Sequence, residues 1–220
     1  MKIKNFHKNS SKISKNLSYV AGILRDGSLP KPYNNQYEIQ VSQDNMEWLE
    51  KAKEILQKLF PKKKIKISKY GKQTPRIKIY SKEIYQNLVE LFEYPGTQNK
   101  WEIPSFIRNG SKEIKKWFIK GFFDAEGEVP LSRQNSKYKV WIRFHHSWDG
   151  DKCTVLEQLK EMLEKEFNIQ CGNVSGPKKE KRFPSFDLAI YGENVHKFFK
   201  QIGTFHPKHI ERLNMMLERT

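Results

Sequence analysis

The sequence is short of cysteine and of long apolar runs, and both shortages restrict its class. Its 220 residues include only two cysteines, Cys153 and Cys171, which do not form a CxxC pair. Such sparse cysteine usage argues against an oxidising compartment and favours a reducing one. No run is long and apolar enough to cross a bilayer, and no signal-peptide core begins the chain. We therefore expect a cytoplasmic protein with no membrane partner.

Several common site motifs are also missing. The chain has neither a Gly-rich phosphate loop nor a nucleophile elbow, so nothing in it supports a P-loop nucleotide site or a hydrolase of the elbow type. His206 and His209 form a histidine pair, but the pair lacks the additional ligands at characteristic spacing that zinc requires. We therefore do not expect a zinc site there.

Acidic residues are scarce relative to basic ones. The chain has 41 Lys and Arg against 25 Asp and Glu, a formal net charge of +16 and a pI near 9.7. An excess of this size favours a polyanionic partner, most simply nucleic acid. A hydrophobic content of 37% and an aromatic content of 13% indicate a folded core, not a disordered basic tail. The length suits one large domain or two small ones.

One stretch, residues 117–129, stands out as a very apolar helix that ends in an acid followed by glycine. Gly127 predicts the end of the helix, because glycine tolerates the left-handed turn found there. Glu126 would then lie at the tip of a buried helix, where a charge is costly without a partner. Apolar or small residues recur on one helical face at Ile114, Trp117, Phe118, Gly121, Phe122 and Ala125.

Residues 17–29 have the same design. When Asp26-Gly27 is aligned on Glu126-Gly127, Ala21 falls opposite Gly121. Helices with facing small residues can approach closely, which would bring their two carboxylates together. Like charges in contact need a cation between them, and a divalent metal such as Mg²⁺ prefers carboxylate oxygens.

The segment Gly121-Phe122-Phe123-Asp124-Ala125-Glu126-Gly127 resembles the signature of the LAGLIDADG homing endonucleases. The first copy matches it less well, since Gly22 lies one place closer to the acid and Ala21 fills the signature position. Two copies at one-domain spacing make the resemblance specific, and it covers nearly the whole chain after residue 16. It implies a monomer with two motifs that binds double-stranded DNA.

The resemblance also implies site residues. In this family the paired motif acids bind divalent metals, and each half cuts one DNA strand. Asp26 and Glu126 match these acids, so they are the expected metal-binding and catalytic residues, with Mg²⁺, Mn²⁺ or Ca²⁺ as the cation. Asp124 matches the first signature acid, and we interpret it as structural because Leu24 takes its place in the first copy.

Family members also use a basic residue near each metal site. The segments 96–100 and 203–208 occupy similar places in the two halves, so Lys100 and Lys208 are the candidates. Polar residues at strand ends hold water networks in the family. Gln43 has that place in the first half, and His146 with Ser147 has it in the second.

Periodicity along the chain predicts an α/β (α+β) fold built from two pseudo-symmetric αββαββα halves, residues 1–109 and 110–220. Residues 1–16 form a loose basic arm. The antiparallel sheets would form a DNA-binding saddle, with the motif helices packed at the centre. Residues 47–60 resemble 154–167, and 79–83 resemble 190–194, which indicates a duplication. The expected strands are 36–42, 62–68, 76–80, 139–145, 169–174 and 183–190.

Several of these strands carry apolar residues on one face and polar residues on the other. Such a polar face can lie along duplex DNA, with cations on phosphates and Gln, Arg or His at base edges. Alternation equally produces a solvated outer face. The candidate DNA contacts are Gln36, Glu38, Gln40, Gln43, Lys64, Lys66, Lys72, Arg76, Lys78, Lys139, Trp141, Arg143, His145, Lys179 and Arg182.

Two other function classes remain open. The first is a binding module of the same fold without cleavage, either an RNA maturase or a DNA-binding regulator, so RNA is a second partner that the resemblance allows. The second is a basic structural protein with no specific site. Retention of both motif acids favours the endonuclease. The target sequence is not encoded in any motif, and a free-standing or intron-encoded enzyme is favoured over an intein. An organelle intron would make the protein organellar.

Overall fold

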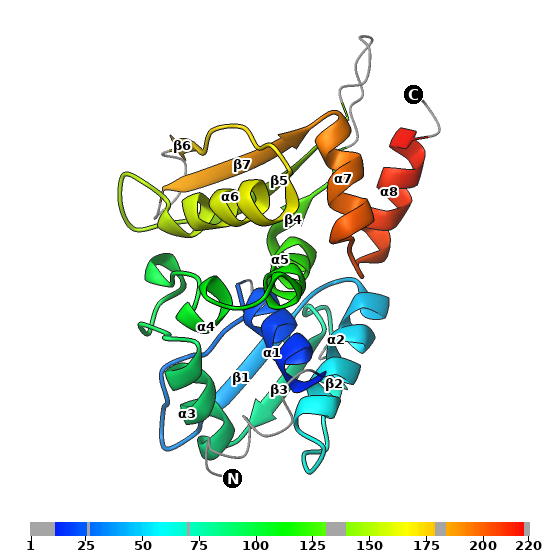
Figure 1. Ribbon diagram of the computed structural model, residues 1–220. Coiled ribbons are helices and arrows are strands. Elements are labelled where there is room, and N and C mark those ends of the chain that lie inside the picture. Colours follow the sequence, from blue (N-terminus) through cyan, green and yellow to red (C-terminus); the bar gives the residue numbers. More distant parts are fainter. Residues whose placement is uncertain (1–11, 26, 70, 131–139, 179–183, 218–220) are drawn as a thin grey trace.

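The first half of the chain contains one motif helix and a small antiparallel sheet. The computed structural model describes residues 12–25, 27–69, 71–130, 140–178 and 184–217 (Figure 1). The elements of the first half are α1 (Lys12–Ile23), β1 (Glu38–Ser42), α2 (Met46–Leu59), β2 (Ile67–Ser68), β3 (Arg76–Tyr80) and α3 (Lys82–Leu91). Asn45 caps α2 by accepting from the Trp48 backbone N–H at 2.8 Å, as expected for this residue type.

The second half repeats this order after a bridge that contains the 3-10 helix η2 (Gln98–Lys100) and α4 (Ser105–Arg108). Its elements are α5 (Lys112–Glu126), β4 (Gly127–Glu128), β5 (Trp141–Ser147), α6 (Thr154–Phe167), β6 (Ser175–Lys178), β7 (Ser185–Tyr191), α7 (Glu193–Gln201) and α8 (Pro207–Leu217). None of the described helices is long and apolar enough to cross a membrane.

The two sheets are antiparallel and have related strand orders. The first sheet has the order β1-β3-β2, and the second has the order β4-β5-β7-β6. Where β4 pairs Glu128 with Arg143, the first half has only an isolated bridge between Ser28 and Gln40. The predicted αββαββα order is thus complete in the second half, and in the first a single bridge replaces the first strand.

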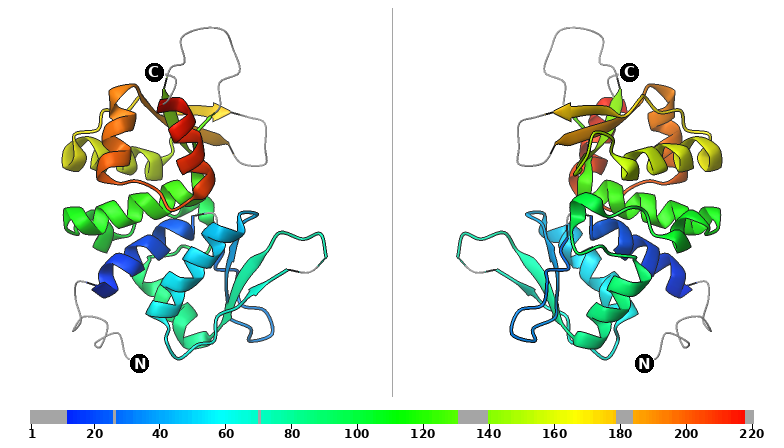
Figure 2. Two further views of the ribbon diagram at one scale, coloured as in Figure 1. Left: turned by 90° about the vertical axis from the view of Figure 1, so that its right-hand side faces the viewer. Right: turned by 90° about the vertical axis from the view of Figure 1, so that its left-hand side faces the viewer.

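The halves stack above and below a central pair of helices, α1 and α5 (Figure 1). In side view the sheets lie on one side of the molecule, and most helices lie on the other (Figure 2). The buried faces of the strands supply the core with Ile39, Val41, Ile77, Ile79, Ile142, Phe144, Leu188 and Ile190. The polar faces of both sheets are therefore presented on the same side, as the sequence predicts.

The central helices touch at two glycines. A Cβ on Gly22 would lie 2.4 Å from the Phe118 carbonyl oxygen, and a Cβ on Gly121 would lie 2.3 Å from the Tyr19 carbonyl oxygen. The prediction that Ala21 faces Gly121 is therefore wrong, because Gly22 makes the contact. The acids were aligned at a spacing of 100 residues, whereas the crossing glycines are 99 apart, since α5 has one more residue between its glycine and its acid.

Helix α5 ends before Gly127, as predicted, but Gly127 does not adopt the left-handed turn on which that prediction rested. The helix ends at Glu126, and Gly127 has φ −83° and ψ 153°, which is extended and not left-handed. Glycine is needed there because a Cβ would lie 2.2 Å from the Phe123 carbonyl oxygen. Close packing of the chain against its own last helical turn therefore explains the residue.

Two predicted strands are shorter or displaced. Within residues 62–68 only Ile67–Ser68 form a strand, although buried Ile65 keeps the alternation. In the range 169–174 Cys171 makes only an isolated bridge to Ile190, and β6 begins at Ser175. Both segments lie at sheet edges, where one side of the backbone faces water and pairing need not extend along the whole alternating segment.

Candidate active site and nucleic-acid interface

Glu126 is the last residue of α5 and lies where the two halves meet. Its side chain is 20% exposed, and its Oε1 atom is 3.8 Å from Nδ1 of His146 at the end of β5. The side chain of His146 is 3% exposed. Burial, helped by the charge of Arg25, lowers the pKa of His146 to about 3, so the imidazole is neutral near pH 7. Asp26, the other predicted metal ligand, lies outside the described residues.

Arg25 is a buried cation at the end of α1 that sequence reasoning missed. Its guanidinium donates to the Trp101 carbonyl oxygen and, at 2.7 Å, to the Glu102 carbonyl oxygen. It also stacks on Trp101, with Cζ 4.2 Å from the ring centroid. Burial lowers its pKa to about 9, and the charge of Glu126 opposes that shift. The arginine thus ties the end of the first motif to the bridge between the halves.

Gln98 holds the same end of the motif from the other side. Its Nε2 donates to the carbonyl oxygens of Leu24 and Gly27, at 2.7 and 2.6 Å. These two hydrogen bonds satisfy carbonyls on both sides of position 26. Gln98 therefore fixes the backbone on both sides of position 26.

Unpartnered buried polar atoms gather at this place. Among the described residues six buried side-chain nitrogen or oxygen atoms have no hydrogen-bond partner. Four of them belong to Arg25 (Nε), Gln98 (Oε1) and His146 (Nδ1 and Nε2). Buried polar groups are normally satisfied, so this concentration of exceptions calls for a bound water, an ion or another polar ligand.

The donor set fits a divalent cation. Glu126 offers carboxylate oxygens and Gln98 an amide oxygen, the ligand types that hard cations take. The described residues contain no group of three or more His, Cys, Asp and Glu arranged to hold a metal. That count omits Asp26, whose position is not described, so it does not test the predicted pair of acids.

Asp124 binds the loop before α8, in keeping with its interpretation as structural. Its fully buried carboxylate accepts from Tyr19 Oη at 2.7 Å, from the Thr204 hydroxyl, and from the Phe205 backbone N–H at 3.1 Å. In the first half Leu24 has the place of Asp124. In the second half a helix side chain accepts from the loop backbone, whereas in the first half a loop side chain, Gln98, donates to the helix backbone at Leu24. Each motif helix is thus anchored to its own following loop.

Replacing Asp124 with Asn is expected to change how stability depends on pH. Burial raises the pKa of Asp124 from its ordinary 3.8 to about 6, although its hydrogen bonds oppose the shift. Between these values the folded state binds more protons than the unfolded state, so stability falls as pH rises. A difference of about two pH units corresponds to roughly 3 kcal/mol. Urea unfolding at pH 4, 5, 6 and 7 should show this decline in the parent and not in Asp124→Asn. Parallel pH curves would contradict the assignment.

The remaining predicted catalytic residues lie around the bridge and α8. Lys100 pairs with Asp149 at 3.0 Å, which links the bridge to the loop after β5. Lys208 is exposed near the start of α8. The Gln43 Oε1 atom accepts from the Asp44 backbone N–H at 2.9 Å just after β1. None of the hydrogen bonds and ion pairs found for these three residues within the described ranges involves Glu126.

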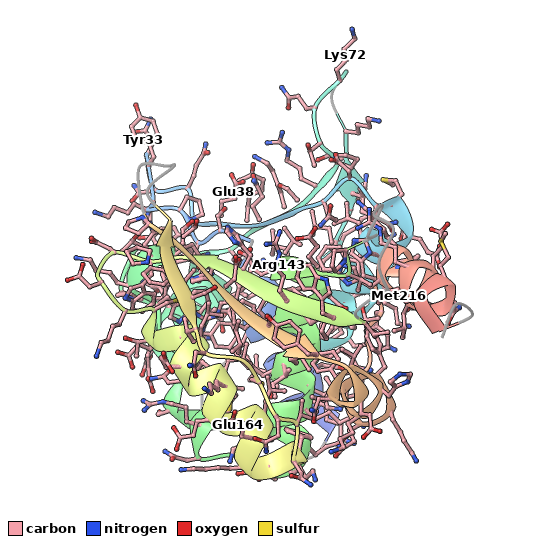
Figure 3. The ribbon with its side chains drawn as sticks, turned by 90° about the horizontal axis from the view of Figure 1, so that it is seen from above. Tyr33, Glu38, Lys72, Arg143, Glu164 and Met216 are labelled. Carbon is pink, nitrogen blue, oxygen red and sulfur yellow. The ribbon has the colours of Figure 1, made fainter. Side chains whose placement is uncertain are left out.

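The predicted contacts of the first half share one face. Register places Glu38 opposite Tyr80, Gln40 opposite Lys78, and Ser42 opposite Arg76, all on the face away from the core. Lys78 pairs with Glu38 at 2.9 Å, and Arg76 donates to Gln73 at 2.8 Å. Seen from above, Tyr33 and Lys72 stand at two projecting tips with Glu38 between them (Figure 3). Gln36, Lys64 and Lys66 are exposed beside these strands.

On the outer face of the second sheet, Arg143 and His145 contact carboxylates. Arg143 donates from Nε to Glu128 at 2.6 Å and approaches Asp187 at 3.4 Å. His145 shares Asp187, with Nδ1 2.7 Å from Oδ1. Trp141 lies beside Arg143 on the same face, with the guanidinium carbon 5.7 Å from its ring. The predicted readers are therefore held in place by carboxylates that sequence reasoning did not include.

Three predicted contacts, Lys139, Lys179 and Arg182, lie outside the described residues. Two tyrosines absent from the prediction have equivalent places on the outer faces. Tyr80 ends β3, Tyr191 ends β7, and each is 54% exposed. The repeated Ile-Tyr pair at 79–80 and 190–191 was the available signal.

Comparison with known proteins identifies relatives over most of the chain. The family model described as a LAGLIDADG-like domain matches residues 19–93 and 113–203. The chain is 28% identical over 210 residues to homing endonuclease I-ApeI of Aeropyrum pernix, covering 92% of this chain and 87% of the relative.

Solved structures agree with the fold. The structure of I-DmoI in complex with DNA and Mn has a TM-score of 0.65 at 18% identity, and the match covers 87% of this chain and 98% of that chain. Full-length DUF199/WhiA from Thermatoga maritima has a TM-score of 0.55 at 16% identity, covering 98% of this chain and 64% of that chain. These likenesses confirm the predicted fold class.

Proposed function

The chain belongs to the LAGLIDADG-like domain family, and from this membership we propose that it is a homing endonuclease. It would hydrolyse one phosphodiester in each strand of a long double-stranded DNA site, with a divalent cation. The observation that carries the proposal is the placement of Glu126. This acid lies at the junction of the halves, among unpartnered buried polar atoms, at the end of a helix packed backbone to backbone on its partner.

DNA as the substrate is supported by charge and by the strand faces. The net charge of +16 suits a phosphate backbone. Both sheets lie on one side of the molecule (Figure 2), and strands β1 and β3 carry polar residues away from the core. The two relatives that carry endonuclease names or DNA in their titles, I-ApeI and I-DmoI, point the same way. We assign each half, 1–109 and 110–220, to one half of the target, which requires only a monomer.

We assign different roles to the residues of the site. Asp26 and Glu126 would hold the cation, for which we propose Mg²⁺. When bound, such a cation activates a water and stabilises charge on the leaving oxygen. Gln98 positions the first motif by binding carbonyls on both sides of position 26, and Arg25 ties the same segment to the carbonyls of Trp101 and Glu102. Lys100 and Lys208 remain candidates for the basic residues near the site. We place the protein in the cytoplasm, or in an organelle if its gene lies in an organelle intron.

The test is selection from a randomised duplex-DNA library in the presence of Mg²⁺. The expected result is enrichment of one long site that is cut in both strands. Replacing Mg²⁺ with EDTA should leave the selected site bound and uncut. Failure to enrich any sequence by binding or by cleavage would contradict the proposal and favour a basic structural protein.

A second candidate function is sequence-specific binding without cleavage. The same fold occurs in DUF199/WhiA, whose name states no endonuclease activity, and that likeness covers 98% of this chain. In the same selection this function predicts a preferred duplex, or a preferred RNA in the case of a maturase, that is bound and stays intact with Mg²⁺ and with Mn²⁺.

A further inference from the structure

His146 interrupts the apolar face of β5. Residues Ile142, Phe144 and His146 alternate toward the core, and the first two are fully buried. The imidazole packs edge-on against Phe122, with ring centroids 5.8 Å apart, and lies 6.5 Å from the Trp148 ring. A polar ring in such surroundings is costly unless its nitrogens are satisfied.

The two ring nitrogens lack ordinary partners within the described part of the chain. Neither has a hydrogen-bond partner of acceptable geometry, although the backbone of Gln98 lies close enough to interact weakly. Nδ1 is 3.8 Å from Glu126 Oε1, which is too long for a hydrogen bond. Two atoms that bind one ion at about 2.0–2.2 Å each can be up to roughly 4 Å apart. The spacing therefore suits an ion shared by both side chains.

We infer that His146 is a further protein ligand of the divalent cation that Glu126 binds in the proposed function. The inference rests on the metal site of the proposed function and adds a nitrogen donor to it. An imidazole ligand strengthens binding of Mn²⁺, Co²⁺ and Ni²⁺ more than that of Mg²⁺ or Ca²⁺. The two halves then differ, because the first half has Gln43 and Asp44 at its strand end, and neither is a nitrogen ligand.

The experiment is a Mn²⁺ titration of the full chain bound to its selected duplex, followed by electron paramagnetic resonance. His146→Gln keeps a polar side chain of similar length and removes the ring. We expect it to weaken Mn²⁺ binding by about 10- to 100-fold and Ca²⁺ binding by less. His196→Gln, an exposed histidine of α7, is the matched control and should leave the affinity unchanged.

A spectroscopic measurement on the unaltered chain keeps the test independent of folding. Spin-echo modulation from a directly bound ¹⁴N imidazole should appear for Mn²⁺ in the parent and in His196→Gln. Mn²⁺ that binds without this modulation, or with equal affinity in a folded His146→Gln, would overturn the inference and leave the proposed function intact. No Mn²⁺ binding to the parent complex would overturn both.

Discussion

Replacing Glu126 with Gln is expected to abolish double-strand cleavage while DNA binding is retained. The substitution keeps the size of the side chain and removes the charge that holds the cation. Because a metal ion contributes several kcal/mol of transition-state stabilisation, the single-turnover rate should fall by roughly a thousandfold, about 4 kcal/mol, or more. Single-turnover cleavage and a gel-shift assay on the same duplex measure the two properties separately. Affinity in the presence of Ca²⁺ should change by less than about tenfold, since strand-face contacts dominate binding.

Glu113→Gln is the matched control for this experiment. It makes the same change at the other end of α5, where Glu113 pairs with Lys15 at 2.9 Å and accepts from the Trp117 indole at the same distance. An exposed ion pair contributes little, so its cleavage rate should remain near that of the parent. If Glu126→Gln still cut both strands at more than a tenth of the parental rate, the proposed catalytic role of Glu126 would be contradicted. A nicked product would assign Glu126 to one strand.

The ends of the two motifs could be located because they repeat in the sequence. The acid-Gly pairs at 26–27 and 126–127 marked the motif ends, and the Gly-Thr pairs at 96–97 and 203–204 marked the loops that anchor them. The buried cation that the repeat did not reveal, Arg25, has no counterpart in the other half. Arg25 aligns with Ala125, so comparing the copies gave it no weight. Its burial depends on Trp101 and Phe118, which come from elements distant in sequence.

In the segment 96–100 the predicted residue is Lys100, and the residue that binds the carbonyls of the first motif is Gln98. The resemblance to the family points to a basic residue here, but Gln98 is the side chain that reaches the first motif, and Lys100 pairs with Asp149. Gln98 has the same offset from Gly96 as Phe205 has from Gly203, and the backbone of Phe205 binds Asp124. The first half thus has Leu24 where the second has the acid Asp124, and it has the amide of Gln98 where the second has Phe205. Such an exchange between backbone and side chain leaves no pattern in one sequence.

The fold was predictable where one face of an element is buried along its whole length. Strands β1, β3 and β5 alternate buried and partly exposed residues over five or seven positions, so their pattern and their pairing agree. The crossing of α1 and α5 was misplaced by one residue, since helical periodicity allows either Ala21 or Gly22 in the contact. Only the distance between the two backbones decides between them.

Because the two backbones approach so closely, replacing Gly121 with Ala is expected to destabilise the fold. In an ordinary helix interior this change is stabilising by about 0.5–1 kcal/mol. Here the new Cβ would lie 2.3 Å from the backbone carbonyl oxygen of Tyr19, and backbone has little freedom to move aside. We expect a loss of roughly 2–4 kcal/mol in the free energy of unfolding, the opposite sign. Urea unfolding measures it. At Gly192 nothing lies within 4 Å, but φ +56° and ψ −131° form a conformation that L side chains rarely adopt, so Gly192→Ala should cost about 1–3 kcal/mol through backbone strain alone.

The double variant Gly22→Ala with Gly121→Ala tests whether the added methyl groups push the two helices apart or are accommodated locally at each site. Each alanine alone would push α1 and α5 apart, because each glycine abuts the backbone of the opposite helix. Once the helices have separated, the second methyl group finds space already made, so the double loss should be smaller than the sum by about 1 kcal/mol or more. Strict additivity would mean that each glycine is accommodated locally. Separation also moves the end of α5 relative to α1. A single glycine variant that is still folded should therefore lose cleavage well before it loses DNA binding.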